Sequence, residues 1–171
     1  MSRELTRENY TSLFGATEGD RLRLGYTNLL AKIETDHTVY GDEAVFGGGK
    51  TMRDGMGMQP GTTQAEGALD YVYTNVVLID PVLGIQKGDL GVRNGEIAGF
   101  GKAGNPDTMD GVDENLIIGA STDAVQADGL IATPGAFDIH VHFNSKELFE
   151  HALASGVTTM MGGGYGGGAT T

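Results

Sequence analysis

The part of the chain that indicates its fold most directly is PGAFDIHVH at residues 134–142. From Phe137 onward, apolar and polar residues alternate strictly, a pattern typical of a β-strand. Residues 145–154 have the apolar spacing of a short helix, and residues 157–161 are rich in β-branched residues and predict a second strand. A strand, a helix and a strand joined by short connections form a crossover unit, so the two strands are expected to run parallel.

Local signals place the ends of the predicted helix. Ser145 is expected to cap its first turn and Gly156 to end it. Leu148, Ala152 and Leu153 are expected to face inward. A two-stranded parallel sheet with one helix cannot bury both of its faces, so this part of the chain reads as the beginning of a larger structure.

Two histidines on the first strand are the strongest candidate for chemistry. Side chains alternate along a strand, so Asp138, His140 and His142 point to one face. The two imidazoles lie about 7 Å apart along the strand by the rise per residue and can converge on one metal ion. The alternative is that each histidine is satisfied by hydrogen bonds at the strand end. His37, in a polar loop, and His151, on the helix, are expected to be solvated.

The N-terminal part predicts a different kind of structure. Thr6 can cap a helix that ends at Gly15, and residues 21–34 read as short strands around a turn. A long irregular stretch follows at residues 38–67, unusual in a compact domain unless it is functional or meets a partner.

Residues 70–133 read as a small antiparallel β unit. Residues 70–80 have the β-branched and aromatic composition of a strand. Asn94-Gly95 between two alternating runs predicts a hairpin, and Asp128-Gly129 predicts a second one. The polar residues 105–115 are expected to form a surface loop.

The composition excludes several functions. The 171 residues carry 23 acids, 11 bases and no cysteine, with a formal net charge of −12. Nucleic-acid binding is therefore not expected, and neither disulfides nor thiolate metal sites can form. The chain has no apolar stretch long enough to cross a membrane and no apolar leader, which predicts a cytoplasmic protein. The many acids and few lysines suit a protein kept soluble in concentrated salt, or simply an acidic protein.

Longer motifs resemble a known family. A β unit followed by PGAFDIHVH resembles the entry to the amidohydrolase superfamily, whose barrels hold metals with an HxH pair on the first strand. YGDEAVFGGGKTMRDGMG at 40–57, GKAGNPD at 101–107 and SGVTTMMGGG at 155–164 resemble the alpha (large) subunit of urease, with the acidic surface resembling ureases of salt-loving archaea.

The resemblance implies a fold and an activity. Residues 1–133 would form the β-rich N-terminal domain, and residues 134–171 would begin a (βα)8 metal-dependent hydrolase barrel that the chain does not complete. Ureases hydrolyse urea to ammonia and carbamate at two nickel ions bridged by a carbamylated lysine. His140 and His142 match the pair that ligates one nickel, and Ala169 matches an alanine whose backbone carbonyl faces a urea nitrogen.

The remaining family residues match no position in the chain, so no catalytic residue is expected within it and the chain alone is predicted to be inactive. The ligand types by themselves suit zinc, iron or nickel equally. Expected partners are the rest of the alpha barrel and the urease beta and gamma subunits. Two other readings stay open, a non-catalytic interaction module of a urease-like assembly and the start of another metal-dependent amidohydrolase.

Overall fold

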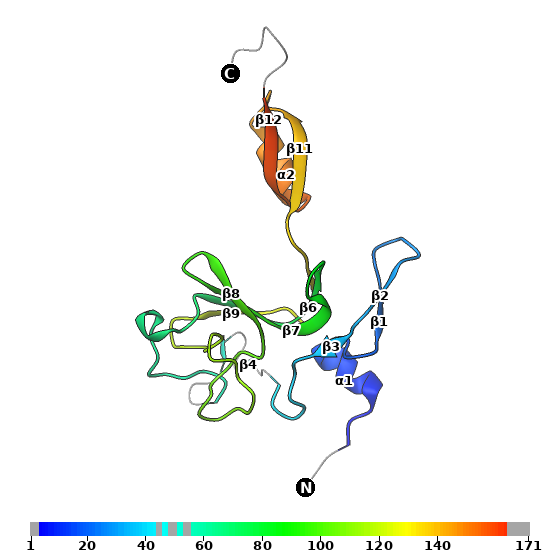
Figure 1. Ribbon diagram of the computed structural model, residues 1–171. Coiled ribbons are helices and arrows are strands. Elements are labelled where there is room, and N and C mark those ends of the chain that lie inside the picture. Colours follow the sequence, from blue (N-terminus) through cyan, green and yellow to red (C-terminus); the bar gives the residue numbers. More distant parts are fainter. Residues whose placement is uncertain (1–3, 44–45, 48–50, 53–55, 164–171) are drawn as a thin grey trace. The chain divides into compact units, whose positions relative to one another are not determined.

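The computed structural model describes residues 4–43, 46–47, 51–52 and 56–163. Its fold is mixed and mostly β, and it divides into two compact units, one ending at Ala132 and one beginning at Thr133 (Figure 1). The domain boundary between residues 133 and 134, which the sequence predicts, stays a prediction. None of the helices in the described ranges is both long enough and apolar enough to cross a membrane.

The first unit holds most of the secondary structure. Its elements are α1 (Arg7–Phe14), β1 (Arg21–Arg23), β2 (Leu30–Lys32), β3 (Thr35–Asp36), β4 (Phe46–Gly47), β5 (Thr51–Met52), the 3-10 helix η1 (Gln64–Glu66), β6 (Tyr71–Asp80), β7 (Gly84–Arg93), β8 (Glu96–Gly101), β9 (Asp123–Gln126) and β10 (Ile131–Ala132).

The local N-terminal predictions are confirmed. The hydroxyl of Thr6 accepts a hydrogen bond from the backbone N–H of Asn9 and so caps α1, and Gly15 ends the helix at φ 79°. Strands β1 and β2 pair antiparallel as a hairpin. Asn94 and Gly95 both have positive φ, 55° and 77°, as the tight turn between β7 and β8 requires.

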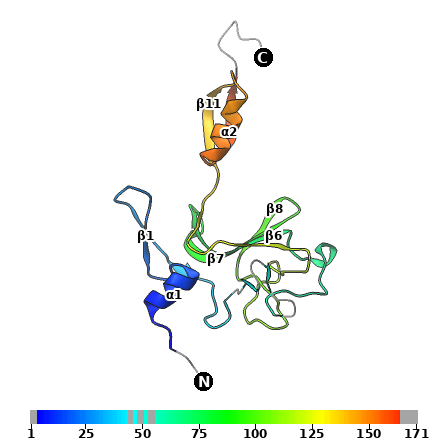
Figure 2. The ribbon, with the colours of Figure 1, turned by 180° about the vertical axis from the view of Figure 1, so that it is seen from behind.

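Two long strands organise a six-stranded sheet. β6 and β7 pair antiparallel along most of their length. The other edge of β7 pairs with β8 and, in parallel, with β3, while the other edge of β6 pairs with β9 and β10. Figures 1 and 2 show both long strands curving, so that each can hold two shorter strands in succession on its outer edge.

The prediction of a second hairpin at Asp128-Gly129 is wrong. β9 and β10 do not pair with each other; both run parallel to β6, at Tyr71–Thr74 and at Val77–Leu78. The intervening Asp128-Gly129 carries the chain past a bend in β6, where Asn75 has a φ of 56° and the register with β7 shifts. The side-chain amide of Asn75 donates a hydrogen bond to the Asp128 carboxylate at 2.8 Å. This bond links the bend in β6 to the turn between β9 and β10. The sheet is therefore mixed and not purely antiparallel.

The core lies between the sheet and the loops that cross it. Its buried residues are Met52, Leu69, Val72, Ala103, Leu116 and Ile118. Leu69 and Leu116 have no exposed surface, and both contact the position of Gly91, where an added Cβ would lie 2.5–2.9 Å from their methyl groups. The predicted surface loop at 105–115 is mostly exposed, but Asn105 at its start and Met109 in its middle are buried.

The second unit is one crossover. It contains β11 (Ala136–His142), α2 (Glu147–Ala154) and β12 (Val157–Gly163), and the two strands run parallel, as the sequence predicted. The helix begins one residue later than expected, because Lys146 occupies the N-cap and the Ser145 hydroxyl bonds to the Glu147 carboxylate instead of to the backbone. Leu148 and Ala152 are half-buried, whereas Leu153 is exposed, contrary to expectation. Gly156 follows the helix at φ 79°.

Candidate functional site

The candidate metal site is the imidazole pair near the carboxyl end of β11. His140 and His142 lie on the same strand, and their ring centroids are 5.2 Å apart with the ring planes at 64°. Both side chains are exposed, whereas Val141 between them is buried. In a barrel-type crossover, the carboxyl ends of the strands are where active sites lie.

A β-bulge in β11 accompanies this geometry. Asp138 pairs with Met160 and Val141 pairs with Gly162, so two residues of β11, Ile139 and His140, face a single residue of β12. Bulges re-aim side chains and recur next to active sites. A Cβ at Gly162 would collide with the Val141 carbonyl, so the close approach of the strands here requires glycine. The Asp138 carboxylate accepts the His140 backbone N–H at 3.0 Å and fixes the start of the bulge.

The spacing of the two rings fits a shared metal ion. Two imidazoles bound to one ion at about 2.1 Å, with an angle near tetrahedral, have ring centroids about 5 Å apart. The centroid distance of 5.2 Å agrees with that value. Imidazole nitrogens are ligands for zinc, copper, iron and nickel, so the donor set fits a borderline divalent metal without selecting one.

Two imidazoles are fewer than the three protein ligands usual in a catalytic metal site. Within the residues described, no group of three or more histidines, cysteines or carboxylates has the geometry to hold a metal ion. Ala169, the predicted substrate contact, lies outside the described residues. Among the described residues, the pair alone therefore does not make up a catalytic metal site.

The two other histidines lie elsewhere. His151 is exposed on α2, as expected. His37 is not simply solvated: it is half-buried, its Nε2 is 2.8 Å from the Gln86 side-chain oxygen, and its ring meets Phe100 edge-on at 5.7 Å. These contacts give His37 a role in packing the outer edge of β7.

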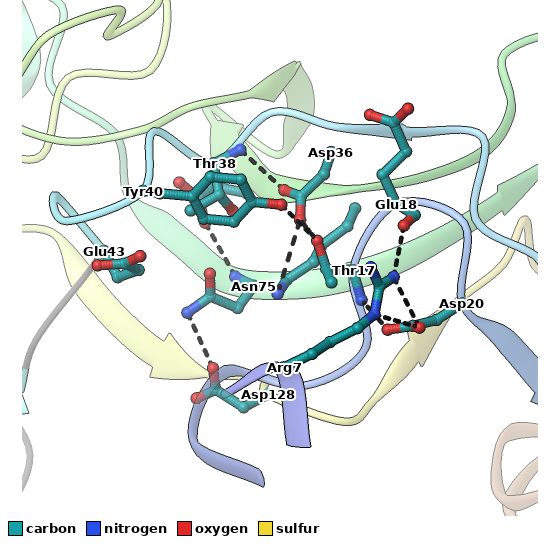
Figure 3. A network of polar contacts seen from close by, with 12 residues as sticks. Arg7, Thr17, Glu18, Asp20, Asp36, Thr38, Tyr40, Glu43, Asn75 and Asp128 are labelled. Carbon is teal, nitrogen blue, oxygen red and sulfur yellow. Dashed lines mark hydrogen bonds and ion pairs between the residues drawn. The ribbon is translucent and has the colours of Figure 1, made fainter. Parts of the chain in front are cut away.

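A partly buried polar network in the first unit was not predicted from the sequence (Figure 3). The Asp36 carboxylate accepts from the Thr17 hydroxyl at 2.7 Å and from the Thr38 N–H at 2.8 Å, and the Thr17 hydroxyl also lies 2.8 Å from the Tyr40 hydroxyl. Lys87 lies next to this network. It is fully buried, and its Nζ is 4.0 Å from the Asp36 carboxylate.

The charge of Lys87 is only partly compensated. Its Nζ has no hydrogen-bond partner among the described residues and lies 5.5 Å from the centre of the Tyr10 ring. Burial lowers the pKa of Lys87, because an ammonium loses its hydration there, and burial raises the pKa of Tyr10. The network connects α1, β3 and β7, so we assign it a structural role.

A buried carboxylate, that of Asp89, lies two residues beyond Lys87 along β7. Asp89 accepts the backbone N–H groups of Asn75 at 2.9 Å and of Ala103 at 2.8 Å. Burial raises the pKa of Asp89 to about 6, although both hydrogen bonds act to lower it. No motif in the sequence distinguishes Lys87 or Asp89 from a solvated charge; only their position in a strand paired on both edges does.

Comparison with known proteins identifies relatives over the whole chain. The family description "Urease alpha-subunit, N-terminal domain" matches residues 3–125. The protein named urease subunit alpha in Haloquadratum walsbyi is 82% identical over all 171 residues, and its namesake in Haloarcula marismortui is 66% identical over the same length. The urease subunit alpha of Edwardsiella ictaluri is 51% identical over 162 residues, or 95% of this chain.

The matched regions are only part of those relatives. The chain spans 30% of the two archaeal proteins and 28% of the bacterial one. The similarity to haloarchaeal proteins agrees with the acidic composition of the chain.

Proposed function

The chain belongs to the urease alpha-subunit family, and on that premise we propose that it supplies the first two metal ligands of a urea-hydrolysing enzyme. The ligands are His140 and His142, and the metal is nickel, as the family implies. The observation that carries the proposal is the 5.2 Å separation of the two rings at the carboxyl end of β11.

The chain's own residues prepare this site. The bulge at Ile139 and His140, fixed by the Asp138 carboxylate, presents both rings on one face of the strand. Val141 is buried on the opposite face of the strand. A rotation of the strand that turned the two rings away would therefore expose the apolar side chain of Val141. A metal ion held by the pair would polarise the carbonyl oxygen of urea as a Lewis acid.

The complete site requires further groups. We propose that the remaining ligands, including a carbamylated lysine, come from the rest of the alpha barrel, and that the Ala169 carbonyl faces a urea nitrogen. The assembly would include urease beta and gamma subunits and act in the cytoplasm. We expect this chain alone to lack urea hydrolysis, because two imidazoles do not complete a catalytic metal site.

The test uses the complete alpha subunit assembled with its partners. His140→Ala and His142→Ala are each expected to reduce bound nickel and urea hydrolysis together. His151→Ala, an exposed histidine on the adjoining helix, is the matched control and is expected to leave both unchanged. Normal nickel content and activity in the double variant His140→Ala/His142→Ala would refute the proposal.

A further inference from the structure

Asp138 shares its strand with the two imidazoles but does not join them in a metal site. Strict alternation along β11 would put Asp138, His140 and His142 on one face, where a carboxylate would be available as a further ligand. In the part of the chain that the structure describes, however, no carboxylate completes a three-ligand site with the two rings. The position of Asp138 beside the pair therefore needs another explanation.

The Asp138 carboxylate bonds to its own strand. One of its oxygens accepts the backbone N–H of His140, two residues further on, at 3.0 Å. This is the hydrogen bond of an Asx turn, in which a side-chain oxygen takes the place of a backbone carbonyl. Ile139 and His140 have no paired residue in β12, so the His140 N–H lies where the strand ladder is interrupted. The carboxylate supplies an acceptor at that point.

The backbone of His140 also decides where its ring lies. A residue in a bulge leaves the regular pleat, and its side chain is re-aimed relative to its neighbours. In a regular strand, residues two apart are separated by about 7 Å. The ring centroids of His140 and His142 are only 5.2 Å apart. The hydrogen bond that restrains the His140 backbone therefore restrains the approach of the two rings as well.

The neighbouring strand restrains the same bulge from the other side. An added Cβ at Gly162 would collide with the carbonyl oxygen of Val141, the first paired residue after the bulge. An added Cβ at Gly163, by contrast, would have nothing within 4 Å. The bulge is thus held by the Asp138 acceptor in β11 and by the close approach of the strands at Gly162.

We propose that Asp138 is a positioning residue of the metal site and acts through its acceptor oxygen, not through its charge. The inference rests on the proposed function, because it assumes that His140 and His142 share a metal ion. Asparagine at position 138 keeps a side-chain oxygen that accepts the His140 N–H, whereas alanine has none. Asp138→Asn and Asp138→Ala therefore separate the acceptor from the charge.

The first measurement uses the 171-residue chain without nickel. Nuclear Overhauser contacts between the ring protons of His140 and His142 report how closely the rings approach. These contacts are expected in the wild type and in Asp138→Asn, and are expected to be lost in Asp138→Ala. Gly162→Ala is also expected to lose them, with Gly163→Ala as the matched control that keeps them. Far-UV circular dichroism checks that each variant is folded.

The second measurement is a calorimetric titration of nickel into the same variants. At about 1 M salt, charges are screened beyond roughly 3 Å, so the loss of a nearby negative charge has little effect by itself. Asp138→Ala is expected to weaken nickel binding about tenfold, as the loss of a group that orients a metal ligand typically does. Asp138→Asn is expected to bind as the wild type does. Glu150→Ala, which removes an exposed carboxylate of α2, is the control and is expected to change nothing.

The two measurements separate this inference from the proposed function. Ring contacts that persist in Asp138→Ala would overturn the inference and leave nickel binding by the pair intact. Loss of ring contacts or of nickel affinity in Asp138→Asn would also overturn it, because the acceptor is kept there; this variant decides the matter even if Asp138→Ala does not fold. Unchanged nickel affinity in His140→Ala/His142→Ala would refute the proposed function itself, and the inference would fall with it.

Discussion

Asp89 allows a quantitative test of the buried charges in β7. Burial raises its pKa from 3.8 to about 6, so the folded protein retains a proton that the unfolded chain has lost. The stability that this proton contributes is fully present below pH 3.8 and is lost as the pH rises through 6. Asparagine does not titrate, so Asp89→Asn removes this pH dependence.

The magnitude follows from the two pKa values. Between pH 5 and pH 7.5 the linkage relation gives a loss of about 1.4 kcal/mol for the wild type that the variant lacks. The two N–H groups bond to different oxygens of Asp89, and in the variant an NH2 group replaces one of these oxygens. This loss of an acceptor costs about 1–3 kcal/mol at every pH. Only the first effect depends on pH, so the wild-type advantage over Asp89→Asn is expected to fall by about 1.4 kcal/mol across this range.

Urea or guanidinium unfolding at several pH values measures this difference. The chain has no tryptophan, so tyrosine fluorescence and far-UV circular dichroism are the probes. The range from pH 5 upward stays above the isoelectric point of about 4.5. Asp110→Asn makes the same substitution at an exposed position and is expected to follow the wild type. Parallel pH profiles for wild type and Asp89→Asn would refute the assignment of a raised pKa to Asp89.

Three further substitutions test the packing of the first unit by the same unfolding assay. Gly91→Ala is expected to cost about 1–3 kcal/mol, because its Cβ would press on Leu69 and Leu116, whereas Gly61→Ala, with open space around it, should be nearly neutral; equal effects would contradict the close packing. Leu116→Ala is expected to cost about 2–5 kcal/mol, against less than about 0.5 kcal/mol for the exposed Leu29→Ala. Thr6→Ala removes the α1 cap and is expected to cost about 1 kcal/mol, and an unchanged midpoint would show that the cap contributes nothing.

Local signals in the sequence predicted the local structure well. The cap at Thr6, the turn at Asn94-Gly95 and the crossover from β11 to β12 each depend on residues close together in the chain, and all three are present. Asp128-Gly129 has the same local signal as Asn94-Gly95 but does not form a hairpin. Its neighbours pair with β6 instead, and that choice depends on the bend at Asn75, more than 50 residues away in sequence.

The buried charges could not be predicted for a similar reason. Lys87 and Asp89 lie in a strand whose two edges are both covered, and the strands that cover them come from distant parts of the chain. For the candidate site, alternation along one strand predicted that His140 and His142 share a face, and their rings are indeed adjacent. Alternation does not predict the bulge that accompanies this arrangement, because a bulge requires the pairing register with β12. Their role as nickel ligands stays a prediction.

The measurement that addresses this role most directly is a calorimetric titration of nickel into the 171-residue chain. We predict weak binding that disappears in His140→Ala/His142→Ala and persists in His151→Ala, since only the first pair presents two adjacent rings. Unchanged nickel affinity in the double variant would contradict the assignment of these two imidazoles as the metal-binding pair.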